Sequence, residues 1–370
     1  MKLEKLLVKL NEIAPLELAE EWDNVGLLAG DTASDIKNIM LTIDLTREVL
    51  DVARAKKVDL IIAYHPPIFE PVKKVVAGQG PSPLLFEAIR SNIAIYSFHT
   101  ALDVAPGGVN DALADMLGLK NTTPLAPGEY ETGKYCKIVC FVPEDDIAPV
   151  SQAVFAAGAG SADPDSHYSQ CSFKAAGTGS FYCGPDSSPT IGKADSFTET
   201  AEYKFETIVP TNLLKKVVNA MSKAHSYQEP AYDIIPLLKG NDSGLGRIGL
   251  LEKPIAIPTL IEHIKKSLKI KSVGIIGPAK GKVQKGAACA GSCGTLLRNV
   301  IKQNCDFYLT GELKHHHALE LQAAGITTIC VSHSNSERLI LAKLAAQLRK
   351  FDNKLTVNLC SKDKDPFIWC

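Results

Sequence analysis

Histidines and carboxylates recur in this chain directly after apolar runs that are typical of buried strands. Five residues share this position: His65, His99, Asp103, His333 and Glu337. Open α/β sheets form their ligand sites at the carboxyl ends of the strands, so these side chains are expected to meet although they lie far apart in sequence. Imidazole and carboxylate groups are ligands that transition metals accept. The pattern therefore predicts a metal centre assembled from both ends of the chain.

His65, His99 and Asp103 each have a simpler explanation when they are considered alone. His65 precedes Pro66 and Pro67, which fix an extended turn and hold the imidazole at the rim of the sheet, where it can also cap the strand end. His99 and Asp103 are expected in a tight loop, and a loop carboxylate is usually solvated or forms an Asx-turn. Metal binding and these structural roles both remain open at this point.

His333 and Glu337 have a sharper competing explanation. Ser334-Asn-Ser-Glu337 fits a capping box at the start of a helix that is expected to run from Ser334 to Lys350. In that case Glu337 would only close the first turn. The capping box does not explain His333, however, and a helix N-terminus also stabilises the carboxylate form that a metal requires. The pattern favours metal binding, with helix capping as the alternative.

Glu312 belongs to a further group of candidates that follows another apolar run. It comes directly after Gly311 and precedes three consecutive histidines, His315, His316 and His317. Glu312 is a candidate general base that would activate water, and a solvated helix start is the alternative. Adjacent residues on a helix point in different directions, so one of the three imidazoles can line a cleft while the others face solvent.

Composition and charge exclude several classes of protein. The net charge is −1 and no long basic run is present, so nucleic-acid binding is not expected. No apolar run reaches the roughly 18 residues that a membrane span needs. Met1–Leu10 alternates charged and apolar residues and is typical of an amphipathic helix rather than of a secretory signal. The protein is therefore expected in the cytoplasm.

The ten cysteines are expected to be reduced thiols, because a cytoplasmic chain of this length does not need a disulfide scaffold. Cys136 and Cys140, like Cys289 and Cys293, are separated by three residues and lack the CxxC spacing of redox and zinc sites. On strands such residues are usually small buried hydrophobes. No redox pair is expected.

The chain divides into three parts. Residues 1–128 alternate predicted strands and helices, which indicates a mainly parallel sheet covered on both faces, and residues 243–370 resume this alternation. Residues 129–242 are rich in Gly, Pro, Ser and Asp. Their order is strand, helix, strand, strand, helix, strand, with one extra short strand because 170–175 and 180–182 are predicted separately. We predict an α/β fold with a two-part core and an inserted ferredoxin-like α+β domain.

Short motifs along the whole chain carry a resemblance to a known family. They are Glu21-Trp-Asp-Asn-Val-Gly-Leu27, Tyr64-His-Pro-Pro-Ile-Phe69, His99-Thr-Ala-Leu-Asp103, Gly107-Gly-Val-Asn-Asp111, Gly246-Arg-Ile-Gly249, Tyr308-Leu-Thr-Gly-Glu312 and Ser332-His-Ser-Asn-Ser-Glu337. In this order they resemble the NIF-three-like family, often labelled GTP cyclohydrolase I type-2 homologues. The longer members carry an inserted domain similar to PII and CutA proteins, and residues 130–240 match that placement.

The resemblance implies a centre of two divalent transition metals per chain, with Zn²⁺ expected and Fe²⁺ or Mn²⁺ as alternatives. His65, Asp103 and Glu337 resemble the ligands of one metal, and His333 with a bridging Glu337 those of the other. Tyr64 stands where the family commonly has a histidine ligand of the second metal. Either Tyr64 supplies its oxygen, or a water or another histidine such as His99 completes that site.

The resemblance also implies a function and an assembly. The first hypothesis is a dimetal hydrolase, similar to a GTP cyclohydrolase, that acts on a small anionic, nucleotide-like or phosphate-bearing substrate, with His99 or Glu312 moving protons. The alternative is a regulatory or metal-handling protein without enzymatic activity, whose inserted domain senses a ligand. The chain is expected to form a homo-oligomer, a hexameric toroid, with no membrane partner.

Overall fold

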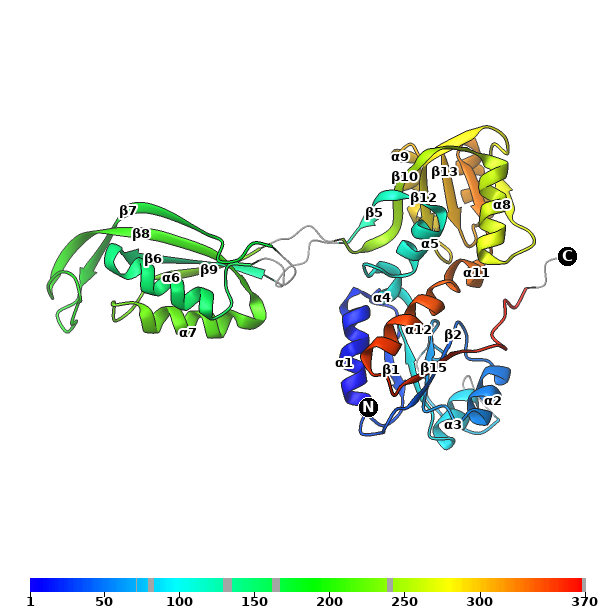
Figure 1. Ribbon diagram of the computed structural model, residues 1–370, viewed down its shortest axis with the longest axis horizontal. Helices are drawn as coiled ribbons and strands as arrows, with labels where there is room; N and C mark the ends of the chain where they lie inside the picture. Colours follow the sequence, from blue (N-terminus) through cyan, green and yellow to red (C-terminus); the bar gives the residue numbers. More distant parts are fainter. Residues whose placement is uncertain (71, 79–82, 129–134, 162–166, 238–241, 368–370) are drawn as a thin grey trace. The chain divides into compact units, whose positions relative to one another are not determined.

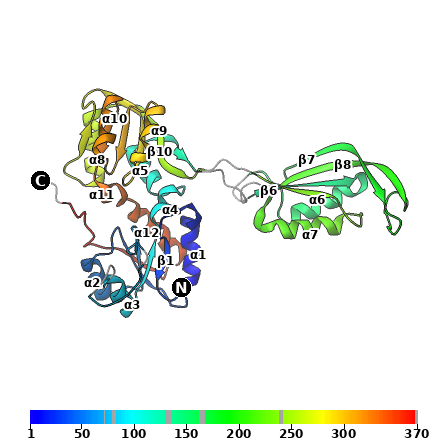
Figure 2. The same cartoon turned by 180° about the vertical axis from the view of Figure 1, so that it is seen from behind.

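The computed structural model describes residues 1–70, 72–78, 83–128, 135–161, 167–237 and 242–367 (Figures 1 and 2). The chain forms two compact units. The core unit consists of Met1–Gly128 together with Asp242–Cys370, and the inserted unit consists of Glu129–Asn241. The expected mixed α/β fold is confirmed, and each unit has a hydrophobic core of its own.

The first sheet of the core unit carries the N-terminal part of the predicted site. In spatial order its strands are β1 (Gly26–Ala29), β4 (Ala94–Ser97), β3 (Leu60–Ala63), β2 (Asn38–Thr42) and β15 (Thr356–Leu359). The last four run parallel to one another, and β1 pairs antiparallel with β4. Strand β15 comes from the C-terminal end of the chain, so this sheet already joins the two halves of the sequence.

Alternation along these strands explains why both faces of the sheet are covered. Successive strand residues point to opposite faces. Ile39 and Leu41 pack in the cluster that contains helices α1 (Leu3–Ile13) and α12 (Ile340–Phe351). Met40, between them, packs in the cluster of α2 (Arg47–Ala55) and α3 (Pro83–Arg90). A strand that is buried on both faces shows the continuous apolar sequence of a parallel sheet.

The second sheet of the core unit carries the C-terminal part of the site. Its strands, in order, are β11 (Gly274–Ile276), β14 (Thr327–Cys330), β13 (Phe307–Thr310), β12 (Lys282–Cys289), β10 (Gly244–Ala256) and β5 (Lys120–Pro127). Strands β12, β13 and β14 are parallel to one another. Helices α5 (Val109–Leu117) and α8 (Ile257–Leu268) share one apolar cluster with this sheet, and α9 (Leu297–Lys302) and α10 (His315–Ala323) share another. This sheet is also covered on both faces.

The inserted unit is a four-stranded antiparallel sheet with two helices. The elements follow in the order β6 (Tyr135–Pro143), α6 (Ile147–Ala156), β7 (Ser172–Cys183), β8 (Ser196–Pro210), α7 (Leu214–Ala224) and β9 (Tyr232–Pro236). The spatial order of the strands is β7-β8-β6-β9. The extra short strand predicted at 180–182 was wrong, because those residues continue β7 without interruption along its pairing with β8.

Two local predictions in the core unit were also wrong. His99–Val104 is not a tight loop but a short helix, α4, which begins with His99 in a left-handed conformation at φ 34°. The single helix expected from Ser334 is divided into α11 (His333–Glu337) and α12.

Strands β1, β5 and β10 have no counterpart among the predicted strands. Strand β5, for example, begins with four exposed residues, so its sequence lacks a clear apolar pattern.

The expectation that no cysteines pair was wrong for Cys289 and Cys293, which form a disulfide across the turn after β12. Gly291, at φ +68°, reverses the chain between them and brings their Cα atoms to 6.2 Å. The spacing of three residues did not reveal this pairing, because the disulfide depends on the shape of the turn between the two cysteines. The other cysteines of the described residues are free thiols.

No helix in the described ranges combines the length and the apolar character that a membrane crossing requires. The longest ones, α8 and α12, have 12 residues each.

The first prediction concerns removal of the inserted unit. The backbone N–H of Gly128 donates to the carbonyl of Ser243 at 3.1 Å, and Pro127 pairs with Gly244 in the ladder of β5 and β10. The two ends of the core unit therefore already meet. We expect that deleting residues 130–241 and joining the ends with a short Gly-Ser linker leaves a soluble, cooperatively unfolding core, as measured by circular dichroism. Aggregation of this variant on expression would contradict the division into two units.

Candidate metal centre

The predicted site lies where the parallel strands of both sheets of the core unit end. His65 follows β3 and Asp44 follows β2, while Glu312 follows β13 and His333 follows β14. Helices α4 and α11 lie between the two sheets in both views (Figures 1 and 2). The carboxyl ends of the two sheets thus contribute side chains to one location, as the rule for open α/β sheets predicts.

His65, His333 and Glu337 form the centre of this location. The Nε2 atom of His65 lies 3.3 Å from Oε2 of Glu337, and the Nε2 atom of His333 lies 3.2 Å from Oε1 of the same carboxylate. The three residues each offer a ligand atom within 4.8 Å of the others. The Glu337 side chain is only 3% exposed. One buried carboxylate therefore faces two imidazoles that come from different sheets.

Each imidazole at the site is oriented by a carboxylate on its other nitrogen. The Nδ1 atoms of the histidines lie at hydrogen-bonding distance from carboxylate oxygens in three pairs: His65 with Asp44 at 2.8 Å, His333 with Glu312 at 3.0 Å, and His99 with Asp23 at 2.8 Å. Metal-ligating histidines usually carry such a partner, which fixes the ring and leaves Nε2 free for the metal. In the first two pairs that free nitrogen is the one that faces Glu337.

The capping box predicted for Glu337 is not formed. The residue at the N-cap of α11 is Ser332, not Ser334, and its side chain makes no capping hydrogen bond. Ser336 instead donates its hydroxyl to the His333 carbonyl at 2.6 Å and accepts the backbone N–H of Gly291 at 2.8 Å. The Glu337 carboxylate faces the imidazoles and not the start of the helix. The capping explanation for this residue was therefore wrong.

Gly291 leaves room for the Glu337 carboxylate. A Cβ atom at this position would lie 3.0 Å from Oε1 of Glu337 and 3.5 Å from Nε2 of His333. The positive φ of Gly291 also disfavours any side chain here. The stretch of small residues after β12 thus lets the backbone approach the site closely.

Asp103 and Tyr64 pair with each other beside this centre. The Tyr64 hydroxyl donates to Oδ1 of Asp103. Burial and the charge of Glu337 raise the pKa of Asp103 to about 7, although the bond from Tyr64 acts against this. Burial and the nearby Asp103 carboxylate raise the pKa of Tyr64 well above its usual range. Tyr64 is therefore a neutral donor at physiological pH, and Oδ2 of Asp103 is not engaged by it.

His99 lies at the edge of the same group of rings. Its ring centre is 5.3 Å from that of His65 and 6.2 Å from that of Tyr64. Asp23 fixes this imidazole and also accepts the backbone N–H of Thr100 at 3.1 Å. His99 is thus held rigidly beside the centre. The imidazole of His316, by contrast, is exposed and meets that of His317 edge to face.

Electrostatics keep both central imidazoles protonated when no metal is bound. Burial opposes the charge of His65, but its hydrogen bond with Asp44 and the nearby Glu337 carboxylate outweigh that effect and raise its pKa to about 10. The bond with Glu337 raises the pKa of His333 to about 9, against the effect of burial. Burial alone would raise the pKa of Glu337, yet the two imidazoles lower it below its ordinary value.

The donor set fits a transition metal. Nε2 of His65 and Oε2 of Glu337 are buried atoms that have no hydrogen-bond partner of good geometry within the described residues. Buried polar atoms are costly without a partner, and a cation between these groups would satisfy both of them. Imidazole nitrogens with carboxylate oxygens suit Zn²⁺ and its neighbours better than Mg²⁺.

Asp44 and Asp23 were missed as functional residues by the sequence analysis. Asp44 ends the apolar run of β2, and this position, after a parallel strand, was the available signal. Asp23 lies in the quoted motif around Trp22, but no pattern near it indicated a partner in α4. Both act on a histidine instead of on a metal, so residue type and spacing alone did not reveal them.

Comparison with known proteins places this chain in a family. The model of the family described as Duf34/NIF3 (NGG1p interacting factor 3) matches residues 1–366. The chain belongs to the Duf34/NIF3 family. A protein of Listeria innocua named GTP cyclohydrolase 1 type 2 homolog is 35% identical over 366 residues, covering 98% of this chain and 97% of that protein. The Bacillus subtilis protein of the same name is 34% identical, with the same coverage.

A solved NIF3-family structure has the same fold. The crystal structure of a Bacillus cereus protein related to NIF3 is 32% identical in sequence and has a TM-score of 0.82. The similarity covers 100% of this chain and 99% of that one. The resemblance expected from the motifs is thus confirmed at the level of the family.

Two motifs of this NIF3-family chain hold the halves of the centre together. The Asn110 side chain donates to the Asp103 carbonyl at 2.8 Å and accepts the backbone N–H of Ala290 at 2.9 Å. Arg247 forms a bidentate pair with Asp111 at 2.6 and 2.8 Å. Helix α4 is therefore fixed to the turn that carries Gly291, and α5 is fixed to β10.

The second prediction concerns protons released on metal binding. At pH 7.5 the pKa values of about 10 and 9 keep His65 and His333 protonated, and each must lose one proton to bind a metal through Nε2. We expect Zn²⁺ binding to release about two protons from these imidazoles, so that affinity rises with pH up to the higher pKa. Calorimetry in buffers with different heats of ionisation measures this number.

His65→Ala provides the control, because it should lower the total release from about two protons per chain to about one. Metal binding with no change in bound protons at pH 7.5 would contradict the ligand assignment.

Proposed function

We propose that this protein is a metal-dependent hydrolase that acts on a small nucleotide-like or phosphate-bearing anion. The observation that carries the proposal is the buried Glu337 carboxylate between two imidazoles, each oriented by a second carboxylate. Catalytic metal sites require rigid ligands with their outer nitrogens engaged, and this arrangement supplies them. The name carried by the relatives supports a purine nucleotide such as GTP as the first substrate to test.

The ligands fall into two groups in this proposal. His65, Asp103 and Glu337 would hold one divalent metal, and His333 with the second oxygen of Glu337 would hold another. Zn²⁺ is the expected metal, with Fe²⁺ and Mn²⁺ as alternatives. Glu337 presents one oxygen to each imidazole, and this geometry supports a bridging role for it. Bound metals of this kind supply a Lewis acid and bring the pKa of water close to neutrality.

The remaining residues would position groups and move protons. His99 is fixed by Asp23 beside His65, so its imidazole is suited to take up or deliver a proton at the substrate. Glu312 was also a candidate for this task. Its carboxylate contacts Nδ1 of His333, which supports a role in orienting that ligand. The Tyr64 hydroxyl donates to Oδ1 of Asp103, and the other oxygen of that carboxylate would face the metal.

The third prediction tests the activity. Protein loaded with Zn²⁺, Fe²⁺ or Mn²⁺ should hydrolyse at least one member of a panel of nucleotides and phosphoesters. We expect His333→Ala to reduce this turnover at least about a hundredfold, because it removes a ligand and leaves the Glu337 charge partly uncompensated. Metal analysis of the same samples should show reduced occupancy.

His167→Ala is the matched control, since His167 is exposed and lies in the inserted unit, outside the metal centre. Stoichiometric metal without turnover of any compound in the panel would contradict the hydrolase. That result would favour the regulatory or metal-handling alternative.

The fourth prediction concerns Tyr64. Its pKa is raised by burial and by Asp103, so deprotonation to a phenolate ligand is costly. Histidine binds a metal in its neutral form without that cost. We expect Tyr64→His to increase the occupancy of the second metal and Tyr64→Phe to change the first site little, as measured by titrating metal-free protein with Zn²⁺. Two tight equivalents in both the wild type and Tyr64→Phe would show that another residue completes the second site.

A further inference from the structure

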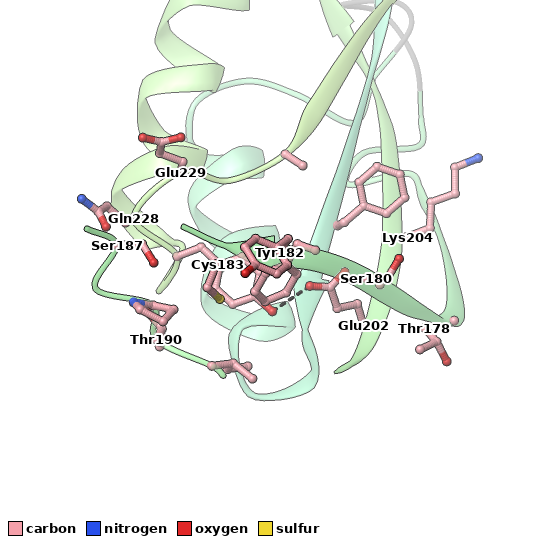
Figure 3. A pocket seen from close by; sticks show the side chains of 18 of the residues that line it. Thr178, Ser180, Tyr182, Cys183, Ser187, Thr190, Glu202, Lys204, Gln228 and Glu229 are labelled. Atoms are coloured by element: carbon pink, nitrogen blue, oxygen red, sulfur yellow. Dashed lines mark hydrogen bonds between the residues drawn. The ribbon is translucent and has the colours of Figure 1, made fainter. Parts of the chain in front are cut away.

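The inserted unit contains a cavity that is separate from the metal centre (Figure 3). Its volume is about 890 Å³, which lies within the range of sites for small organic molecules. Strands β7 and β8, the segment from Gly184 to Ile191 and the segment after α7 from Tyr227 to Ala231 form its walls. All of these residues belong to the inserted unit, so the cavity is complete within it.

A buried carboxylate is the main polar group of this cavity. Glu202 is 8% exposed, and its Oε1 accepts the Tyr227 hydroxyl at 2.7 Å. Within the described residues its other oxygen, Oε2, accepts no hydrogen bond. Gly179 makes room for that oxygen, because a Cβ atom there would lie 2.0 Å from it. The glycine at position 179 of β7 thus has a local reason in the position of Glu202.

The residues around Tyr227 fix the donor to Glu202. Nε2 of His225 lies 3.0 Å from the Phe141 carbonyl, and its Nδ1 accepts the Tyr227 backbone N–H at 3.0 Å. An imidazole with one donating and one accepting nitrogen is neutral. Its ring lies 4.9 Å from that of Tyr227 and holds it in place. Neither His225 nor Tyr227 therefore compensates the charge of Glu202.

Lys204, the one basic residue among the described cavity-lining residues, is engaged elsewhere. Its Nζ pairs with Glu206 at 3.3 Å on the same strand. Asp186 and Glu229 add further negative charge to the lining. A buried carboxylate without a cationic partner is unfavourable, so the cavity is electrostatically complementary to a positive charge.

Aromatic rings complete the lining. Phe181, Tyr182 and Tyr227 all border the cavity, and the rings of Phe181 and Tyr227 lie 6.0 Å apart. Ring faces attract ammonium and guanidinium groups, and this attraction adds to that of a carboxylate when the site is partly desolvated. A hydrated metal ion would make no use of these rings.

We propose that this cavity binds a small organic cation with ammonium or guanidinium groups, and that Glu202 is the residue that pairs with its charge. The inserted unit then recognises a ligand of a different chemical class from the anionic substrate proposed for the core unit. This binding is independent of the metal centre and does not rest on the proposed hydrolase activity.

The fifth prediction tests this binding on the full chain by calorimetry. The probes are putrescine, spermidine and agmatine, and 1,4-butanediol has the length of putrescine without its charges. We expect at least one of the cations to bind and the diol not to bind. Glu202→Gln keeps the shape and an acceptor for Tyr227 but removes the charge, and it should weaken binding at least about tenfold.

Glu199→Gln, an exposed position on the same strand outside the cavity, should bind like the wild type. Tyr182→Ala removes an exposed ring from the lining and serves as a second test if Glu202→Gln does not fold; it should also weaken binding. The proposal would be overturned by equal binding of the diol, by unchanged affinity in Glu202→Gln, or by binding of GTP at this cavity in preference to the three cations.

Discussion

The core unit depends on one buried ionic contact, the Glu337 carboxylate between His65 and His333. A carboxylate that is 3% exposed must be compensated, and it is compensated here by imidazoles that follow strands of two different sheets. Loss of either imidazole would leave a buried charge with half of its partners. The contact that suits the site to a metal is therefore also one that joins the two sheets, and metal binding and the stability of the core unit are expected to be coupled.

Supporting contacts hold the neighbours of these residues in register. The Asp363 carboxylate, near the C-terminal end, accepts the backbone N–H of Ile43 at 2.8 Å and the Arg338 guanidinium at 2.5 Å. Ile43 directly precedes the Asp44 that orients His65, and Arg338 directly follows Glu337. The C-terminal segment therefore ties the end of the first sheet to α11. The site is rigid because its flanking backbone is fixed from several separate parts of the sequence, not because of one local motif.

The residues of the centre were predictable where a single strong pattern marked them, and not where their role depends on a distant partner. His65 and His333 follow apolar runs, and the rule for parallel sheets was enough to bring them together. Asp23 and Asp44 orient histidines only because of the order in which strands and helices pack, which spacing does not encode. The Ser334 capping box is a valid local pattern, yet the two imidazoles offer the buried Glu337 carboxylate a stronger partner than backbone N–H groups do. The short helix α4 escaped prediction because it begins with a strained residue at His99.

The turn after β12 shows how the second sheet limits what the centre can tolerate. A Cβ atom on Gly291 would lie 3.0 Å from the Glu337 carboxylate, and the disulfide of Cys289 and Cys293 closes the chain around this glycine. The backbone N–H of Gly291 binds Ser336, and its carbonyl accepts the N–H of Glu312 at 3.1 Å. Gly291 therefore fixes Ser336 and Glu312 through its backbone and leaves space for Glu337 beside it. A side chain at this position would press on the Glu337 carboxylate and approach Nε2 of His333, so the close approach of this backbone limits which residues the turn can hold.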